Sequence, residues 1–193
     1  GQLVPATASM PPPATTSNGS EVFVDRSGKV ILQSANLDQI AWTFVSDDLS
    51  GWLTTPVLDN NQLFEFQRIT AAGNPLTIES PSQQLSIRGQ TISFDMVQGT
   101  FSIEDAQQSL IKIHDHSFEV AQFYYQMPAD PARLGQFMAT GAGSYRTTLA
   151  GSSKEQINVT WKRDCKLEKQ DDEHILSLDG KAEIRFSNGK IPV

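Results

Sequence analysis

The sequence contains a single cysteine, Cys165, among 193 residues, so no disulfide can form within the chain. A lone cysteine suits a small buried apolar role, and it leaves a zinc-type cysteine pair out of reach. No apolar run approaches the roughly 18 residues that a membrane-spanning helix needs. Clear helical patterns are also missing. The two weak candidates, residues 48–58 and 130–139, contain Gly and Pro, and we expect loops or short turns there.

Positive charge is scarce through most of the chain. Residues 1–144 carry 6 Lys and Arg against 14 Asp and Glu, whereas residues 145–193 carry 9 against 8, which gives a net charge of −7. Nucleic-acid phosphates require a concentrated cationic face, which an acidic body lacks. The charge distribution therefore argues against nucleic acid as a partner.

The first twenty residues, GQLVPATASMPPPATTSNGS, consist mainly of Pro, Ala, Ser and Thr and offer almost nothing to bury. Such a segment cannot offset the entropy that it would lose on ordering. We therefore expect residues 1–20 to form a disordered tether and residues 21–193 to form a single domain.

Strand patterns dominate the remainder. In LSIRGQTISFDMVQGTFSIEDA, residues 85–106, apolar side chains take alternate positions on both sides of Gly99. A period of two predicts pleated strands with one apolar face and one polar face. The same alternation recurs in residues 109–125, 157–169 and 174–193.

Glycine marks the starts of several of these strands. The pattern Gly-x-apolar-x-apolar occurs at residues 28–32, 99–103, 180–184 and 189–193. It predicts a corner at each glycine, followed by a strand, and residues 22–34 form a hairpin pattern about the first corner. Apolar strand faces must be covered by a second sheet or by closure. The predicted fold class is all-β, an antiparallel two-sheet folded-over β-jellyroll or sandwich with short hairpins.

Residues 85–106 resemble the repeating unit of the lipopolysaccharide-transport β-jellyroll family, the OstA-, LptA- and LptC-like proteins. Residues 69–87, 139–146 and 174–191 resemble the strands and Gly corners that adjoin this unit. Residues 37–66 and 124–137 have no counterpart in the family pattern.

The resemblance implies a periplasmic or cell-envelope protein without catalytic activity or cofactor. Its apolar crease between two sheets would bind a lipopolysaccharide-like glycolipid. Its other partners would be jellyroll envelope proteins that add through edge strands, including further copies of the chain arranged head to tail. For the residues expected to line the crease, an ordinary dry core is the alternative role. They are Leu85, Ile87, Ile92, Phe94, Phe101, Ile103, Ile111 and Ile113.

Basic residues near the C-terminus are the candidates for facing the phosphates of such a ligand. Foremost are Arg146, Lys162 and Arg163, and Lys154, Lys166 and Lys169 belong to the same set. The alternative is a solvated face, because Asp164, Glu168 and Asp171 are interleaved with them.

Few residues suggest catalysis. His114 and His116 flank Asp115 at a spacing that suits a metal on one strand face, which would make a metal-dependent hydrolase an alternative. No third ligand has a fixed spacing, so we expect a strand edge or turn and neither a metal site nor catalytic residues. The other alternative is an adhesion or polysaccharide-binding β-sandwich with a dry core, which uses Trp and Tyr rings. Those rings are Trp42, Trp52, Trp161, Tyr124, Tyr125 and Tyr145.

Overall fold

The computed structural model describes residues 3–7, 19–24, 29–36, 39–54, 66–149 and 155–187. In these ranges every regular element is a strand except one short 3-10 helix, so the predicted all-β class is confirmed. The elements are β1 (Leu3–Thr7), β2 (Gly19–Val24), β3 (Val30–Asn36), β4 (Gln39–Ser46), β5 (Asp48–Thr54), β6 (Phe66–Ser80), η1 (Pro81–Gln83), β7 (Leu85–Asp95), β8 (Thr100–Ile113), β9 (His116–Gln126), β10 (Gln136–Thr140), β11 (Gly143–Thr148), β12 (Gln156–Trp161), β13 (Asp164–Gln170), β14 (Glu173–Asp179) and β15 (Glu183–Ser187).

The strands form one continuous antiparallel sheet, which folds over along its four long central strands, β6 to β9. The pairing register between neighbouring central strands is interrupted once in each case. The interruptions lie between Ala72 and Leu76 in β6, between Arg88 and Ile92 in β7, and between Glu104 and Ser109 in β8. A local break in a ladder lets a strand bend, so these positions mark where the sheet turns over.

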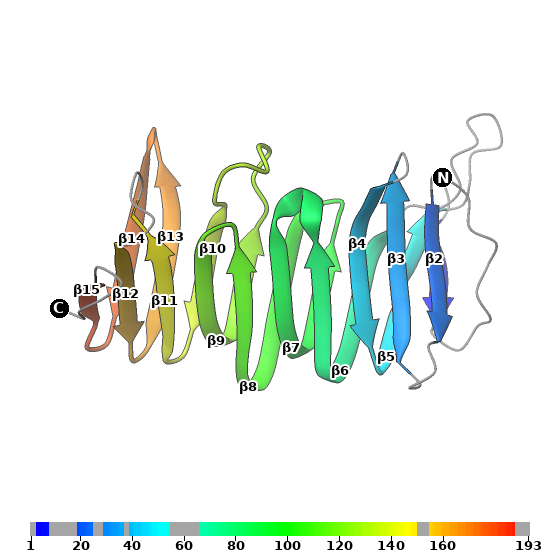
Figure 1. The fold of residues 1–193 in the computed structure, drawn as a ribbon, viewed down its shortest axis with the longest axis horizontal. Helices are drawn as coiled ribbons and strands as arrows, with labels where there is room; N and C mark the ends of the chain where they lie inside the picture. Colours follow the sequence, from blue (N-terminus) through cyan, green and yellow to red (C-terminus); the bar gives the residue numbers. More distant parts are fainter. Residues whose placement is uncertain are drawn as a thin grey trace.

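The bends divide the sheet into two ladders. The first ladder contains β2, β3, β4, the end of β6, the start of β7, the end of β8, the start of β9, β11, β12 and β15. The second contains β1, β5, the other halves of β6 to β9, β10, β13 and β14. Figure 1 shows two rows of strands, one behind the other. We call the line of bends the ridge and the opposite long side the rim.

The core lies between the two ladders. Phe94 of the second ladder meets Trp42 and Phe44 of the first edge-on, with ring centroids 5.1 and 5.4 Å apart. Phe118 of the first ladder meets Phe137 of the second at 4.8 Å. Alternate residues of the central strands therefore point inward and pack against the facing ladder, as the period of two predicts.

A buried carboxylate accepts hydrogen bonds from the backbone N–H groups at the bend of β7. Asp105, which is 8% exposed, accepts hydrogen bonds from the backbone N–H groups of Gln90 at 2.9 Å and Thr91 at 2.7 Å. The hydroxyl of Ser109 also donates to it. Both N–H groups lie where the β7–β8 register is interrupted. The side chain thus takes the place of the strand partner that the bend removes.

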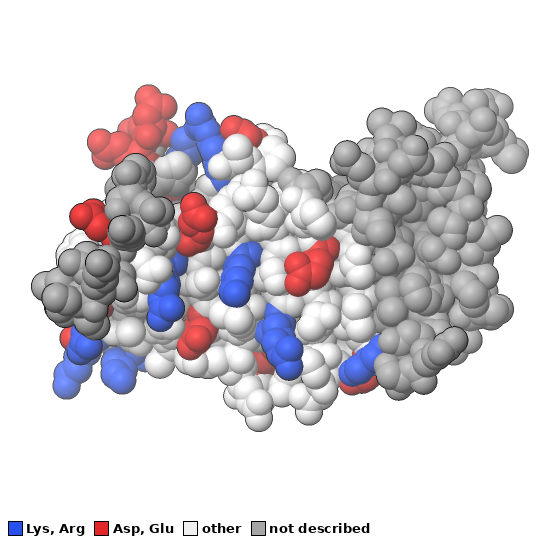
Figure 2. All heavy atoms as spheres, viewed as in Figure 1, with Lys and Arg blue, Asp and Glu red and all other residues white. Residues whose placement is uncertain are grey.

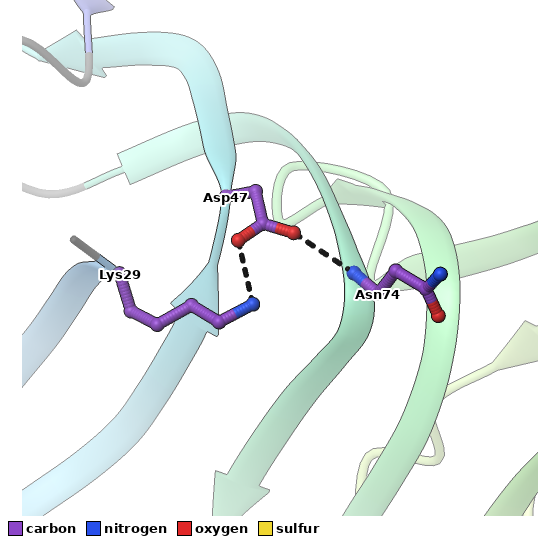
Figure 3. Close-up of polar contacts among 3 residues, drawn as sticks. All are labelled: Lys29, Asp47 and Asn74. Carbon is purple, nitrogen blue, oxygen red and sulfur yellow. Dashed lines mark hydrogen bonds and ion pairs between the residues drawn. The ribbon is translucent and has the colours of Figure 1, made fainter. Parts of the chain in front are cut away.

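A second carboxylate has a comparable position at the bend of β6. Asp47 accepts a hydrogen bond from the backbone N–H of Asn74 at 2.9 Å and pairs with Lys29 (Figure 3). The hydrogen bond from Lys29 lowers the pKa of Asp47. Because Lys29 precedes β3, this link joins the start of that strand to the ridge.

Several turn predictions are confirmed. β2 and β3 pair as a hairpin with Val24 opposite Val30, although its turn, residues 25–28, lies outside the described residues. Gly99 and Gly180 occupy corners at φ values of +68° and +75°, a conformation that favours glycine. The corners at Gly28 and Gly189 are outside the described part of the chain.

In the first segment expected to be a loop or turn, residues 48–58, the structure has a strand over 48–54. In the second, residues 130–139, the expected turn is confirmed over 130–135, and a strand begins at Gln136. Residues 48–54 form β5, which pairs with β6. Residues 136–140 form β10, which pairs with both β9 and β13. Each is too short to show a clear alternation, and long-range pairing stabilises it. The expected tether contains β1 and the first two residues of β2, and its other residues, 1–2 and 8–18, lie outside the described ranges.

Candidate functional site

In the described part of the chain, the sheet has two edge strands near the C-terminus, β14 in the second ladder and β15 in the first. Directly paired residues of antiparallel strands share a face. Four apolar residues of these edge strands pair with inward-facing residues of the neighbouring strands, so they lie on the inner face too. The pairs are Leu176–Leu167, Leu178–Cys165, Ile184–Val159 and Phe186–Ile157. We call Leu176, Leu178, Ile184 and Phe186 the open end.

Exposure rises sharply at the open end. Ile184 and Phe186 are each 53% exposed and Leu176 is 37% exposed. One strand further in, Val159 is 2% exposed and Cys165 is fully buried. The apolar interior is thus covered along the middle of the fold and accessible at this end. Exposed apolar side chains that share one face are typical of a binding surface.

Strand β14 also carries an apolar residue on its other face. Ile175 is 39% exposed, close to the value of Leu176, but it pairs with Glu168. Alternation places Ile175 on the outer face and Leu176 on the inner face. The two neighbours therefore differ mainly in the face they occupy, which makes them a matched pair for experiments.

A polar pair lies on the inner face near the rim. His116 Nδ1 and Tyr145 Oη are hydrogen-bonded at 2.7 Å, and the two rings stack with centroids 5.8 Å apart. Tyr145 also stacks on Phe118 at 4.9 Å. Burial lowers the pKa of His116, as does the nearby His114, while burial raises the pKa of Tyr145. The neutral forms of both groups are therefore favoured.

Two cavities adjoin this end of the fold. One of about 480 Å³ runs along β11, β12 and β15. Most of its lining residues belong to the outer face, among them Arg146, Asn158 and Arg185, and the inner-face residues Tyr145, Val159 and Phe186 also line it. The other, of about 450 Å³, lies at the rim, and Arg133 and Lys169 are among its lining residues.

Charge at the rim cavity is mixed. Arg133 pairs with Asp130 at 3.6 Å, and both line this cavity. Acidic side chains also gather at the tip of the nearby β13–β14 hairpin (Figure 2), which contains Asp171, Asp172 and Glu173. The local charge therefore does not favour an anionic ligand here.

The structure brings together all eight residues expected to line a crease. They belong to one core cluster, and none is more than 4% exposed. Burial is what both a dry core and a closed crease require, so their contact with a ligand stays a prediction.

The predicted phosphate-facing residues lie on different elements. Arg146 is on the outer face of β11, where its Nε donates to Asn158 Oδ1 at 2.7 Å. Lys162 and Arg163 form the β12–β13 turn on the ridge, and Arg163 pairs with Asp179 at 2.8 Å. Of the wider set, Lys166 pairs with Glu168, Lys169 lines the rim cavity and Lys154 is outside the described residues. Their phosphate-facing role stays a prediction.

The histidine pair of the sequence lies where a turn was expected. His114 and Asp115 form the turn between β8 and β9, with His114 at a φ of +52°. Among the residues that the structure describes, no group of three or more His, Cys, Asp or Glu side chains could hold a metal ion.

The predicted buried role of Cys165 is confirmed, and burial raises the pKa of its thiol to about 12. Three of the six candidate rings for polysaccharide are buried too. Trp42, Trp161 and Tyr125 are at most 6% exposed, whereas Tyr124 is 48% exposed. The side chain of Trp52 is outside the described part of the molecule.

Sequence reasoning missed the two features that distinguish this end. Leu176 and Leu178 alternate about Ser177, a signal that was available, but nothing local shows that β14 is an edge strand. His116 and Tyr145 are 29 positions apart, and only the β9–β11 pairing brings them together. Such pairing of distant strands leaves no local pattern in the sequence.

In the described ranges, no helix has the length and apolar character needed to cross a bilayer. No family model matches the chain, and no curated protein matches it.

Proposed function

We propose that this chain binds an acyl-chain amphiphile, of the lipopolysaccharide-like glycolipid class, between the two ladders of its folded sheet. The observation that carries the proposal is the open end, where the inner face continues past the covered core. Leu176, Ile184 and Phe186 are exposed there, whereas their strand neighbours are more covered: Val159 is buried, and Leu167 and Ile157 are partly buried. An acyl tail laid against them extends the apolar interior outward.

Binding of an acyl tail at this site requires only the burial of apolar surface and no specific polar contact. Each CH₂ group removed from water contributes about 0.8 kcal/mol, so burying half of a twelve-carbon tail yields roughly 5 kcal/mol before the costs of association. Flexible tails fit an irregular apolar surface without fixed geometry. The protein acts in this proposal as a binding or bridging module without catalysis, in the periplasm or cell envelope.

The edge strands suggest how such a module meets its neighbours. Among the strands that the structure describes, β14 and β15 each pair with one strand only, so their other edges are candidates for strand addition by another jellyroll protein or a further copy of the chain. Head-to-tail addition would extend both ladders at once. Sedimentation velocity over a rising protein concentration tests it: a growing series of oligomers supports self-association, and a single monomer species contradicts it.

The test of lipid binding compares the two faces of the edge strands. A fluorescent fatty-acid probe is titrated into wild type, Phe186→Asp, Ile184→Asp and the outer-face control Ile175→Asp. A carboxylate on the inner face must desolvate next to the tail, so we expect the two inner variants to bind at least tenfold more weakly. The control should bind as wild type does. No saturable binding by wild type, or equal loss in all three variants, would contradict the proposal.

A further inference from the structure

We propose that His116 and Tyr145 bind the uncharged polar group, a hydroxyl or carbonyl, that joins the head of the amphiphile to its acyl tail. This inference rests on the proposed function, since it places one part of the ligand within the same site. The inference gives a role to a polar pair that lies on an otherwise apolar inner face.

The pair has the right position along the inner face. His116 begins β9 at the rim, directly opposite Ile113, and Tyr145 lies on β11 opposite Phe118 and Val159. Val159 in turn pairs with Ile184 of the open end. On the inner face Tyr145 thus lies two strands in from Ile184, and His116 lies beyond it at the rim; in this proposal the tail runs from the open end toward Tyr145 and its polar end lies beside His116.

Part of the hydrogen-bonding capacity of His116 is unused, whereas the Tyr145 hydroxyl bonds both to His116 and to the side chain of Thr147. Nδ1 of His116 is engaged by the Tyr145 hydroxyl, and within the described part of the chain Nε2 has no hydrogen-bond partner. When the Tyr145 hydroxyl donates to Nδ1, Nε2 carries the proton and donates to an oxygen. In the other tautomer, Nε2 accepts. A hydroxyl suits both tautomers, and a carbonyl suits the first.

The electrostatics favour an uncharged partner. Burial opposes a charge on the imidazole, and His114 adds to this effect, while Asp115 opposes it only in part. A neutral imidazole gains little from a phosphate but makes an ordinary hydrogen bond with a hydroxyl. A tail that enters an apolar site also draws its attached polar group out of water, and that group then needs a partner.

The experiment measures competition by decan-1-ol and by 1-fluorodecane against a fluorescent fatty-acid probe. The two ligands share a chain, and fluorine replaces the hydroxyl with a poor hydrogen-bonding group. We expect His116→Leu and Tyr145→Phe to weaken decan-1-ol binding about 3- to 10-fold, the range of one neutral hydrogen bond, and to leave 1-fluorodecane unchanged. The control is His114→Gln, in the adjacent turn, which should change neither ligand.

A second measurement needs no substitution. In wild type, the ¹⁵N resonance of His116 Nε2 should shift on addition of decan-1-ol and not on addition of 1-fluorodecane. Equal effects of His116→Leu on both ligands, or an unshifted Nε2 in saturated protein, would overturn the inference while leaving tail binding intact. Wild type that binds neither ligand would overturn the proposed function and this inference together.

Discussion

Replacing Asp105 by Ala should destabilise the fold strongly, because this buried carboxylate holds the bend of β7. Its two oxygens accept from the N–H groups of Gln90 and Thr91 and from the Ser109 hydroxyl. Alanine leaves two backbone N–H groups without their acceptor in a bend that is partly buried. An unsatisfied buried donor costs about 1–3 kcal/mol, so we expect a loss of roughly 2–5 kcal/mol.

Asp95 provides a matched control. It also accepts from two backbone N–H groups, those of Val97 at 3.0 Å and Gln98 at 3.1 Å, but in an exposed turn. Water replaces the carboxylate there, so Asp95→Ala should cost about 1 kcal/mol or less. Asp105→Asn retains one carbonyl oxygen and should fall between Asp105→Ala and wild type.

Urea unfolding followed by circular dichroism measures these differences, provided that the slope with denaturant stays constant among the variants. Equal losses for Asp105→Ala and Asp95→Ala would refute the reasoning, because the number of hydrogen bonds would then matter and their burial would not. An Asp105→Ala variant that unfolds at the wild-type midpoint would refute the role of this carboxylate altogether.

Three further predictions concern stability and reactivity. Phe118→Ala should cost about 3–5 kcal/mol, because this fully buried ring meets Phe137 and Tyr145, whereas Tyr124→Ala on the outer face of the same strand should cost about 0.5 kcal/mol or less. A similar cost for both in urea unfolding would contradict the two-ladder core. Cys165 should resist a thiol reagent at pH 8 in the folded protein and react after denaturation, since burial raises its pKa to about 12; rapid labelling of folded protein would show that the thiol is accessible. The folded pKa of His116 is lowered from 6.5, so the unfolded chain takes up this proton first. The stability that neutral His116 contributes is complete above pH 6.5 and is lost as the pH falls through the lowered pKa. Wild type should therefore lose more stability than His116→Gln between pH 7 and 5. Parallel pH profiles of unfolding for the two proteins would contradict this prediction.

The sequence predicted the parts of the fold that repeat locally. The alternation from Leu85 to Ile103 located the central strands and their inward faces, and Gly99 and Gly180 located two corners. These signals depend on a residue and its near neighbours, so one chain is enough to show them.

The features of the fold and of the site that the sequence did not predict depend on pairing between distant segments. β5 and β10 are short, and their partners stabilise them more than their own patterns do. The bends follow from register interruptions, and Asp105 looks in the sequence like any other acidic residue. The exposure of Phe186 follows from its place on the last strand of a ladder, which alternation alone does not reveal.

Photo-cross-linking at the matched pair on β14 tests the central claim most directly. Benzoylphenylalanine is placed at Leu176 in one variant and at Ile175 in another, in cells that make glycolipid, and adducts are identified by mass spectrometry after irradiation. The two positions are 37% and 39% exposed but occupy opposite faces. We expect lipid adducts at position 176 and none at position 175. Equal labelling at both positions, or labelling at 175 alone, would contradict binding between the ladders.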